Sequence, residues 1–174
     1  AAKKELEAGL GDAGTDKLQI LALLTRPRQI CCDPALVYEN YTGKSAKLAL
    51  CMELLQSCRE SGHRVLLFSQ FTSMLSRIAD CLDTAQIPYY TITGATKSSD
   101  RLALVNDFNA GSTPVFLISL KAGGTGLNLT GADVVIHYDP WWNSSAQNQA
   151  SDRAHRIGQT KTVQVYKLIA KNTL

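Results

Sequence analysis

From residue 46 onward the chain alternates short apolar runs with amphipathic segments. Residues 46–62 carry Leu48, Met52, Leu55 and Arg59 at helical spacing, and Gly62 is placed to end that helix. Further helices are predicted over 72–86, 98–111 and 143–158. Their candidate N-caps are the first residues of each range: Thr72 or Ser73, Ser98 or Ser99, and Asn143 or Ser144. Apolar runs predict strands over 64–70, 88–93, 114–120, 132–139 and 162–170.

The order of these elements predicts an α/β fold with an open, mostly parallel sheet flanked by helices. The apolar runs are short and nearly continuous, as in strands buried on both faces. Right-handed crossovers place the loops that follow the strands along one edge, where such sheets bind ligands. We therefore expect the chemistry in four loops that contain SQFTS, TGATK, SLKAGGTG and YDPWWN.

The first 45 residues follow a different pattern. Residues 1–24 are rich in Ala, Leu, Lys and Glu and predict a helix interrupted at GDAGTD, and residues 33–45 predict a loop. Pro27 is expected to kink or break the helical stretch around it, because proline has no N–H to donate. Ser45 or Thr42 is expected to cap the helix that begins at residue 46.

Composition is typical of a globular domain, with 45% hydrophobic and 19% charged residues among 174. The formal net charge is only +3. After Ser151, however, the chain has one acidic residue and five basic residues, which points weakly to a polyanionic partner. The five cysteines show neither Cys-x-x-Cys spacing nor a zinc-type cluster, so we interpret them as small buried residues of a reducing compartment and expect no metal site. No membrane span or signal peptide is predicted, and the protein is expected to be intracellular.

Two glycine-containing segments are candidates for phosphate-binding sites. TGKSAK, 42–47, ends like a phosphate-binding loop, but Tyr38 stands where that loop needs glycine. SLKAGGTGLN, 119–128, has a glycine cluster after a strand, with Lys121 beside it. A dinucleotide-binding loop would need a full helix next, and there is no room for one before residue 132. The glycine cluster is either a tight turn or an approach to an anion.

The last predicted helix carries Gln149, Arg153 and Arg156 at positions i, i+4 and i+7, which would place them in one stripe. Such a stripe is either a solvated face or a donor of charge to phosphates held elsewhere, as an arginine finger is. Of Trp141 and Trp142, one is expected to close the core edge and the other to be exposed, where it could stack on a nucleotide.

In order and spacing, LLFSQFTSML, GATKSSDR, ISLKAGGTGLNLTGADVVIHYDPWWN and QASDRAHRIGQ closely resemble the C-terminal motor lobe of the Swi/Snf family of helicase-like ATPases. That family belongs to helicase superfamily two, and the similarity runs over about residues 15–174. RQICCDP also resembles the family's lobe-joining region, although Pro27 departs from its pattern. The resemblance implies a RecA-like lobe, related to the P-loop NTPases, with residues 1–45 as the lobe-joining segment. Residues 46–174 would then be the C-terminal domain, truncated at its end.

The resemblance also implies roles for individual residues. ATP and Mg²⁺ would lie between this lobe and an N-terminal RecA-like lobe that carries the phosphate loop, with Arg153 and Arg156 supplied to the ATP phosphates. Nucleotide contacts are implied at Gln149, Gly126 and Asn128. Segments that follow the DNA backbone are implied at Ser69, Gln70, Thr93, Gly94, Lys121, Ala122 and Gly123, and Trp142 matches a tryptophan that touches DNA.

The resemblance implies that this chain is half of an ATP-driven translocase of double-stranded DNA, as in chromatin remodellers. By itself the chain is expected not to hydrolyse ATP. It would act in the nucleoid of a bacterium or the nucleus of a eukaryote. One alternative is a non-catalytic nucleic-acid-binding module, although binding alone would not need the arginine stripe. Another is a nucleotide-cofactor reductase domain, which the missing helix after the glycine loop disfavours.

Overall fold

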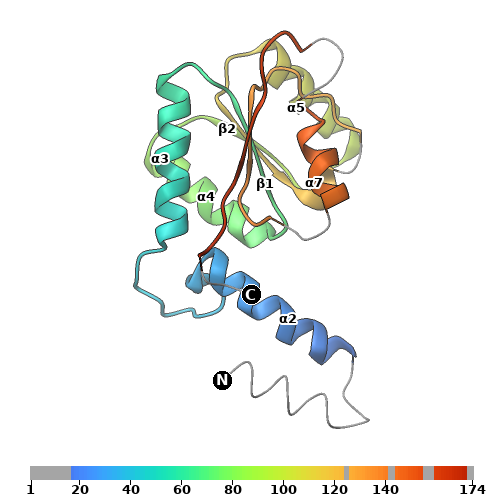
Figure 1. Cartoon of the computed structure of the whole chain (residues 1–174). Coiled ribbons are helices and arrows are strands. Elements are labelled where there is room, and N and C mark those ends of the chain that lie inside the picture. Colours follow the sequence, from blue (N-terminus) through green and yellow to red (C-terminus); the bar gives the residue numbers. More distant parts are fainter. Residues whose placement is uncertain (1–16, 124–125, 141–143, 155–158, 172–174) are drawn as a thin grey trace.

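The computed structural model describes residues 17–123, 126–140, 144–154 and 159–171. Figure 1 shows a central sheet with helices on both faces and helix α2 extending away from one end of it. The helices are α2 (Lys17–Cys32), the 3-10 turn η1 (Pro34–Leu36), α3 (Ala46–Glu60), α4 (Thr72–Thr84), α5 (Ser98–Ala110), α6 (Leu120–Gly123) and α7 (Ser144–Ser151). The strands are β1 (Val65–Ser69), β2 (Tyr89–Ile92), β3 (Val115–Ser119), β4 (Val134–His137) and β5 (Gln164–Lys167).

The five strands pair in the order β2-β3-β1-β4-β5, and every pairing is parallel. This confirms the predicted parallel α/β sheet. Because all strands point the same way, the loops that follow them emerge at one edge, which we call the carboxyl edge. α2 joins the body at this edge, at the lower end of the sheet in Figure 1.

Alternation along the strands divides the core between the two faces. In β1, Val65 and Leu67 pack on the face covered by α3 and α4, whereas Leu66 and Phe68 pack on the face covered by α5. The strands β1, β3 and β4 are buried throughout, as expected for parallel strands covered on both sides. β5 is exposed at all four positions, because it lies at the end of the strand order.

Helix ends follow the sequence prediction only in part. The Ser45 hydroxyl caps α3 by accepting a hydrogen bond from Leu48 N–H at 3.2 Å, and Gly111 ends α5 as expected. The predicted side-chain caps of the next two helices are wrong: α4 begins after Phe71 and α5 after Lys97, and neither residue makes a side-chain cap bond. At α4 the Ser69 hydroxyl accepts from Phe71 N–H instead, so the hydroxyl lies two residues before the cap position.

The predicted break at Pro27 is also wrong, because α2 runs without interruption from Lys17 to Cys32. Pro27 removes one N–H donor from α2, but the other hydrogen bonds of the helix and its contacts with the body remain. The Tyr138 hydroxyl donates to the Cys32 carbonyl at 2.9 Å, and Arg28 donates to Gln70 at 2.7 Å. These contacts hold the C-terminal half of α2, beyond Pro27, against the body.

The cysteines are free thiols, and Cys32, Cys51 and Cys58 are buried in the core on the α3 and α4 face. Burial raises the pKa of Cys51 to about 12, so this thiol is protonated and unreactive near neutral pH. In the described ranges, no helix combines the length and apolarity needed to span a membrane. Nor do the described residues bring together three or more His, Cys, Asp or Glu side chains suited to hold a metal ion.

Candidate functional site

Four loops meet at the carboxyl edge, and each carries residues singled out from the sequence. The strand order sets their order in space: Thr93 and Gly94 after β2, Lys121 to Gly123 after β3, then Ser69 and Gln70 at the end of β1, and Asp139 after β4. These segments are as many as 70 residues apart in the chain, and the parallel pairing alone brings them into one row. The structure therefore places the predicted backbone-contacting segments side by side.

Exposure divides this row into two groups. Gly94 and Lys121 are exposed and Thr93 is half-buried, so these residues can meet a ligand. Ser69, Ala122 and Gly123 are buried, and these residues shape the loops instead. A Cβ added to Gly123 would lie 3.0 Å from the Phe68 ring, so glycine lets α6 pack closely on β1. The four-residue α6 agrees with the sequence prediction that no full helix fits between β3 and residue 132.

Arg101 holds the loop after β2 in shape, a role that the sequence did not reveal. Its Nε donates to the Thr96 carbonyl at 2.8 Å, and its Nη2 donates to the carbonyls of Thr93 and Gly94 at 3.2 and 3.1 Å. The Thr96 hydroxyl in turn accepts from Thr93 N–H at 3.0 Å. A planar guanidinium with several donors is suited to gathering carbonyls in this way, and the loop is therefore preformed.

The loop between α6 and β4 presents a second set of predicted residues. Gly126 has a φ of 74°, which favours glycine. Apart from its chain neighbours, no residue that the structure describes comes within 4 Å of a Cβ added to it. Asn128 is exposed between the buried Leu127 and Leu129, and Asn109 Nδ2 donates to its carbonyl at 2.7 Å. The side chain of Asn128 therefore faces solvent from a fixed backbone.

The predicted stripe of Gln149, Arg153 and Arg156 on one helix is not what the structure shows. α7 ends at Ser151, Gln149 is exposed, and Arg153 is buried with 6% of its surface accessible. The helix ends because the next turn is tighter: Arg153 N–H donates to the Ala150 carbonyl, and Ala154 N–H donates to the Ser151 carbonyl. In addition, Leu129 N–H donates to the Arg153 carbonyl at 2.9 Å. Gln149 and Arg153 therefore do not share a helical face. Arg156, Trp141 and Trp142 lie outside the described residues.

Gln159 is another residue that the sequence did not single out for its own role. Its Nε2 lies 2.7 Å from the Ala132 carbonyl and 3.0 Å from the Ala154 carbonyl. It thereby ties the segment after α7 to the loop before β4. The Arg153 region is thus held from both sides, by Leu129 and by Gln159.

Asp139 is the most perturbed carboxylate of the carboxyl edge. Burial raises its pKa to about 6, although hydrogen bonds from Gln70 N–H and Ser69 act in the opposite direction. Gln70 N–H lies 3.1 and 3.0 Å from the two carboxylate oxygens of Asp139. The hydrogen bonds to Asp139 therefore come from the loop after β1.

Residues 46–158 match the family model described as the helicase conserved C-terminal domain. This chain belongs to that family. An uncharacterized ATP-dependent helicase of Mycoplasma pneumoniae is 43% identical over 159 residues, which is 89% of this chain and 15% of the relative. The ISWI chromatin-remodeling complex ATPase ISW1 of Saccharomyces cerevisiae is 37% identical over 187 residues, which is 99% of this chain and 17% of the relative.

Solved structures agree with this assignment of the helicase C-terminal domain. The Sulfolobus solfataricus SWI2/SNF2 ATPase core in complex with dsDNA matches with a TM-score of 0.76 and 31% identity, covering 97% of this chain and 37% of that one. The C-terminal part of the Fun30 ATPase domain matches with a TM-score of 0.71 and 30% identity, covering 99% of this chain and 61% of that one. The resemblance to the Swi/Snf C-terminal lobe and the RecA-like fold are thus confirmed, for a chain that spans less than a fifth of the two curated relatives described here.

Proposed function

We propose that this helicase C-terminal domain is the second motor lobe of an ATP-dependent translocase of double-stranded DNA. The observation that carries the proposal is the row of loops at the carboxyl edge, with Gly94 and Lys121 exposed in it. A similar solved structure, the SWI2/SNF2 ATPase core, is a complex with dsDNA. Relatives named as ATP-dependent helicases and remodeling ATPases support the use of ATP. Such a protein would act in the nucleoid of a bacterium or the nucleus of a eukaryote.

Within this proposal, residues 1–45 join the two lobes and residues 46–174 form the second lobe. An N-terminal RecA-like lobe elsewhere in the full-length protein would hold ATP and Mg²⁺, since Tyr38 stands where a phosphate loop ending at 42–47 would need glycine. The described residues offer no cluster of acidic or metal-ligating side chains for Mg²⁺, so no step of the proposal uses the metal through this lobe.

On the nucleotide side, this lobe would supply Arg156, with Gln149, Gly126 and Asn128 nearby in the motifs that approach ATP. A guanidinium stabilises negative charge that develops on the transferred phosphoryl oxygens. Because Arg153 has only 6% of its surface exposed, we assign the direct contact to Arg156 and expect Arg153 to support that segment as well as the reaction.

On the DNA side, Thr93, Gly94 and Lys121 would contact phosphates, and Trp142 would also touch DNA. Ser69, Ala122 and Gly123 would hold these loops in position from beneath, because these residues are buried. Contacts to phosphates carry no sequence information, so movement along DNA would not require a particular base sequence. Closure of the two lobes on ATP and their reopening would then shift the grip of this lobe along the backbone.

The test is steady-state ATP hydrolysis by the full-length protein with saturating duplex DNA. Arg156→Ala should lower kcat by about 10³-fold or more with DNA affinity largely unchanged, the scale known for finger arginines. Arg156→Lys should restore little, because an ammonium does not reproduce the planar guanidinium. Arg59→Ala, at an exposed position of α3, is the matched control and should leave kcat unchanged. Wild-type kcat in Arg156→Ala would favour the alternative, a nucleic-acid-binding module without catalysis.

A further inference from the structure

Three side chains connect α2 to two loops of the carboxyl edge. Arg28 Nη2 donates to Gln70 Oε1 at 2.7 Å, and Gln70 Nε2 donates to the Asp139 carbonyl at 3.0 Å. Gln70 N–H also faces both carboxylate oxygens of Asp139, at 3.1 and 3.0 Å. We call Arg28, Gln70 and Asp139 the edge joint. It links residues 42 and 69 positions apart in the chain, in a helix, the loop after β1 and the loop after β4.

The side chain of Gln70 uses both of its polar atoms inside the chain. The guanidinium of Arg28 needs an acceptor and the carbonyl of Asp139 needs a donor, and a carboxamide offers one of each on a single planar group. A carboxylate or an ammonium at this position would satisfy only one neighbour. Gln70 is therefore fitted to connect α2 with the loop after β4, and a contact from this side chain to a phosphate would have only the second N–H of Nε2 to use.

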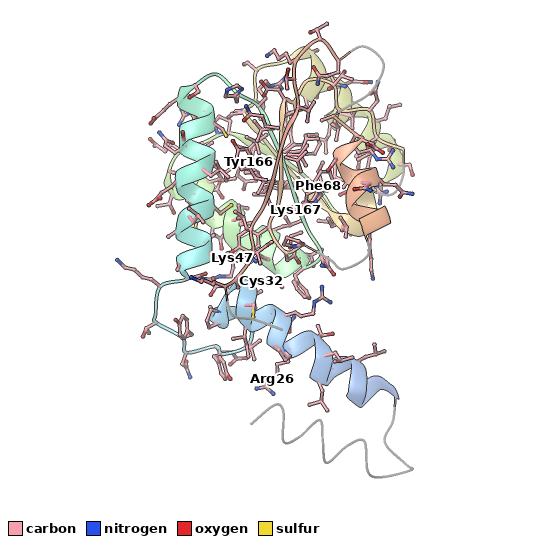
Figure 2. The ribbon with its side chains drawn as sticks, in the orientation of Figure 1. Arg26, Cys32, Lys47, Phe68, Tyr166 and Lys167 are labelled. Carbon is pink, nitrogen blue, oxygen red and sulfur yellow. The ribbon has the colours of Figure 1, made fainter. Side chains whose placement is uncertain are left out.

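Other contacts fix α2 at the same place. The Arg28 guanidinium lies over the Phe71 ring, 5.7 Å from its centroid, and the Tyr138 hydroxyl donates to the Cys32 carbonyl at 2.9 Å. Arg77 donates to the buried carboxylate of Asp33 at 2.7 Å. Figure 2 shows Cys32 where the end of α2 meets the body, close to Lys47 at the start of α3. α2 cannot shift relative to the sheet without breaking these contacts or moving the loops after β1 and β4.

We propose that Gln70 is a positioning residue, which couples the position of α2 to the loops of the carboxyl edge through the edge joint. The inference rests on the proposed function, in which α2 belongs to the segment that joins the two lobes. Movement of the other lobe would then reach the loop after β4 through Arg28 and Gln70. The role of Gln70 is thus mechanical and differs from the DNA contact implied by the family motif.

The experiment is a double-mutant cycle in the full-length protein, with ATP hydrolysis measured against duplex DNA concentration. Gln70→Ala and Arg28→Ala should each lower kcat at saturating DNA about five- to tenfold, the range of coupling between linked sites. The half-saturating DNA concentration should change less than about twofold, and the double variant should be no slower than the slower single variant. Arg26→Ala is the matched control, since Arg26 lies on the same helix over the Tyr38 ring, 5.9 Å from its centroid, and should retain wild-type kcat.

Two results would overturn the inference. One is a rise in the half-saturating DNA concentration with unchanged kcat in Gln70→Ala, which would show that Gln70 contacts DNA. The other is strict additivity of Gln70→Ala and Arg28→Ala. If Gln70→Ala does not fold, Arg28→Lys decides the question: it keeps the charge but not the planar donor, so a lowered kcat supports the joint and a wild-type kcat refutes it.

Hydrogen exchange of the full-length protein separates this inference from the proposed function. Gln70→Ala should speed amide exchange both in α2 and at Tyr138 and Asp139, because the joint links them. This holds even if the wild-type protein shows no ATP hydrolysis stimulated by DNA, a result that would refute the proposed function alone. Unchanged exchange in α2 would refute the joint whatever the activity.

Discussion

His137 and Asp139 lie two residues apart at the end of β4, and burial perturbs both. Burial lowers the pKa of His137 to about 4, with the positive charge of Lys167 acting in the same direction. Its ring stacks on Phe68 at 5.7 Å between centroids, and its Nε2 lies 3.0 Å from Ser151 Oγ. Burial raises the pKa of Asp139 to about 6. In both residues the neutral form is the one that folding favours.

These shifts have opposite effects on stability as pH falls. Between pH 6.5 and about 4, His137 is protonated in the unfolded chain but neutral in the folded one. The free energy of unfolding therefore decreases as pH falls through this range. Folded Asp139 is protonated near pH 6, whereas the unfolded residue is protonated only near its ordinary pKa of 3.8. The free energy of unfolding therefore increases as pH falls over the same range. The two contributions largely cancel in the wild-type chain.

Single substitutions should uncover each contribution. From pH 6.5 to 4, we expect Asp139→Asn to lose about 1–3 kcal/mol more stability than wild type, and His137→Gln to lose less by a similar amount. Urea unfolding at the two pH values measures these differences, with other titrating groups common to all three proteins. Parallel pH profiles of the three proteins would contradict the assignment.

At the scale of the element, α3 begins at a specific hydroxyl. Ser45 Oγ accepts from Leu48 N–H at 3.2 Å and donates to the Cys32 carbonyl at 3.3 Å, so it caps α3 and ties it to the end of α2. Thr42, the other cap candidate in the sequence, is exposed three residues earlier. The start of this helix is therefore tied both to its own first turn and to another element.

Ser45→Ala should lower the free energy of unfolding by about 1–2 kcal/mol, since it removes a cap and a bond to a second helix. Thr42→Ala is the matched control and should change it by less than about 0.5 kcal/mol, as at other exposed positions. Urea unfolding at constant pH measures both. An equal loss in the two variants would show that Ser45 is not the cap that matters in solution.

At the scale of the whole molecule, the carboxyl edge and the amino edge of the sheet should behave differently toward DNA. Lys121 is exposed at the carboxyl edge, and Lys161 is exposed just before β5, at the opposite edge. If the carboxyl edge follows the DNA backbone, only the first of these lysines should contribute to the salt dependence of binding. The two residues have the same charge and thus form a matched pair.

We expect the chain to bind duplex DNA weakly and in a salt-sensitive manner, and to hydrolyse no ATP by itself. Lys121→Ala should reduce the slope of log K against log salt by about one, and Lys161→Ala should leave it unchanged. Fluorescence anisotropy of a labelled duplex at several salt concentrations measures the slopes. Equal slopes in both variants and wild type would exclude Lys121 from the DNA path.

The sequence by itself determined the sheet, its parallel direction and the edge at which the candidate site lies. Apolar runs, helical spacing and the alternation of the two depend on residues within a few positions of one another, so they are legible in the chain. The same holds for the short turn after β3 and for the end of α5 at Gly111. The family motifs identified the segments of the carboxyl edge, which the parallel pairing then brought into one row.

Only the tertiary structure decided where polar groups find their partners. α7 ends at Ser151, and just beyond it the Arg153 carbonyl accepts a hydrogen bond from the N–H of Leu129, which lies 24 residues earlier in the chain. Gln70 is engaged by Arg28 and Asp139, which are 42 and 69 residues away, and α2 continues through Pro27 while its C-terminal half is anchored to the body. A hydrogen bond of a buried group depends on which distant donor or acceptor the fold brings within reach, and no local pattern in the sequence encodes that distance.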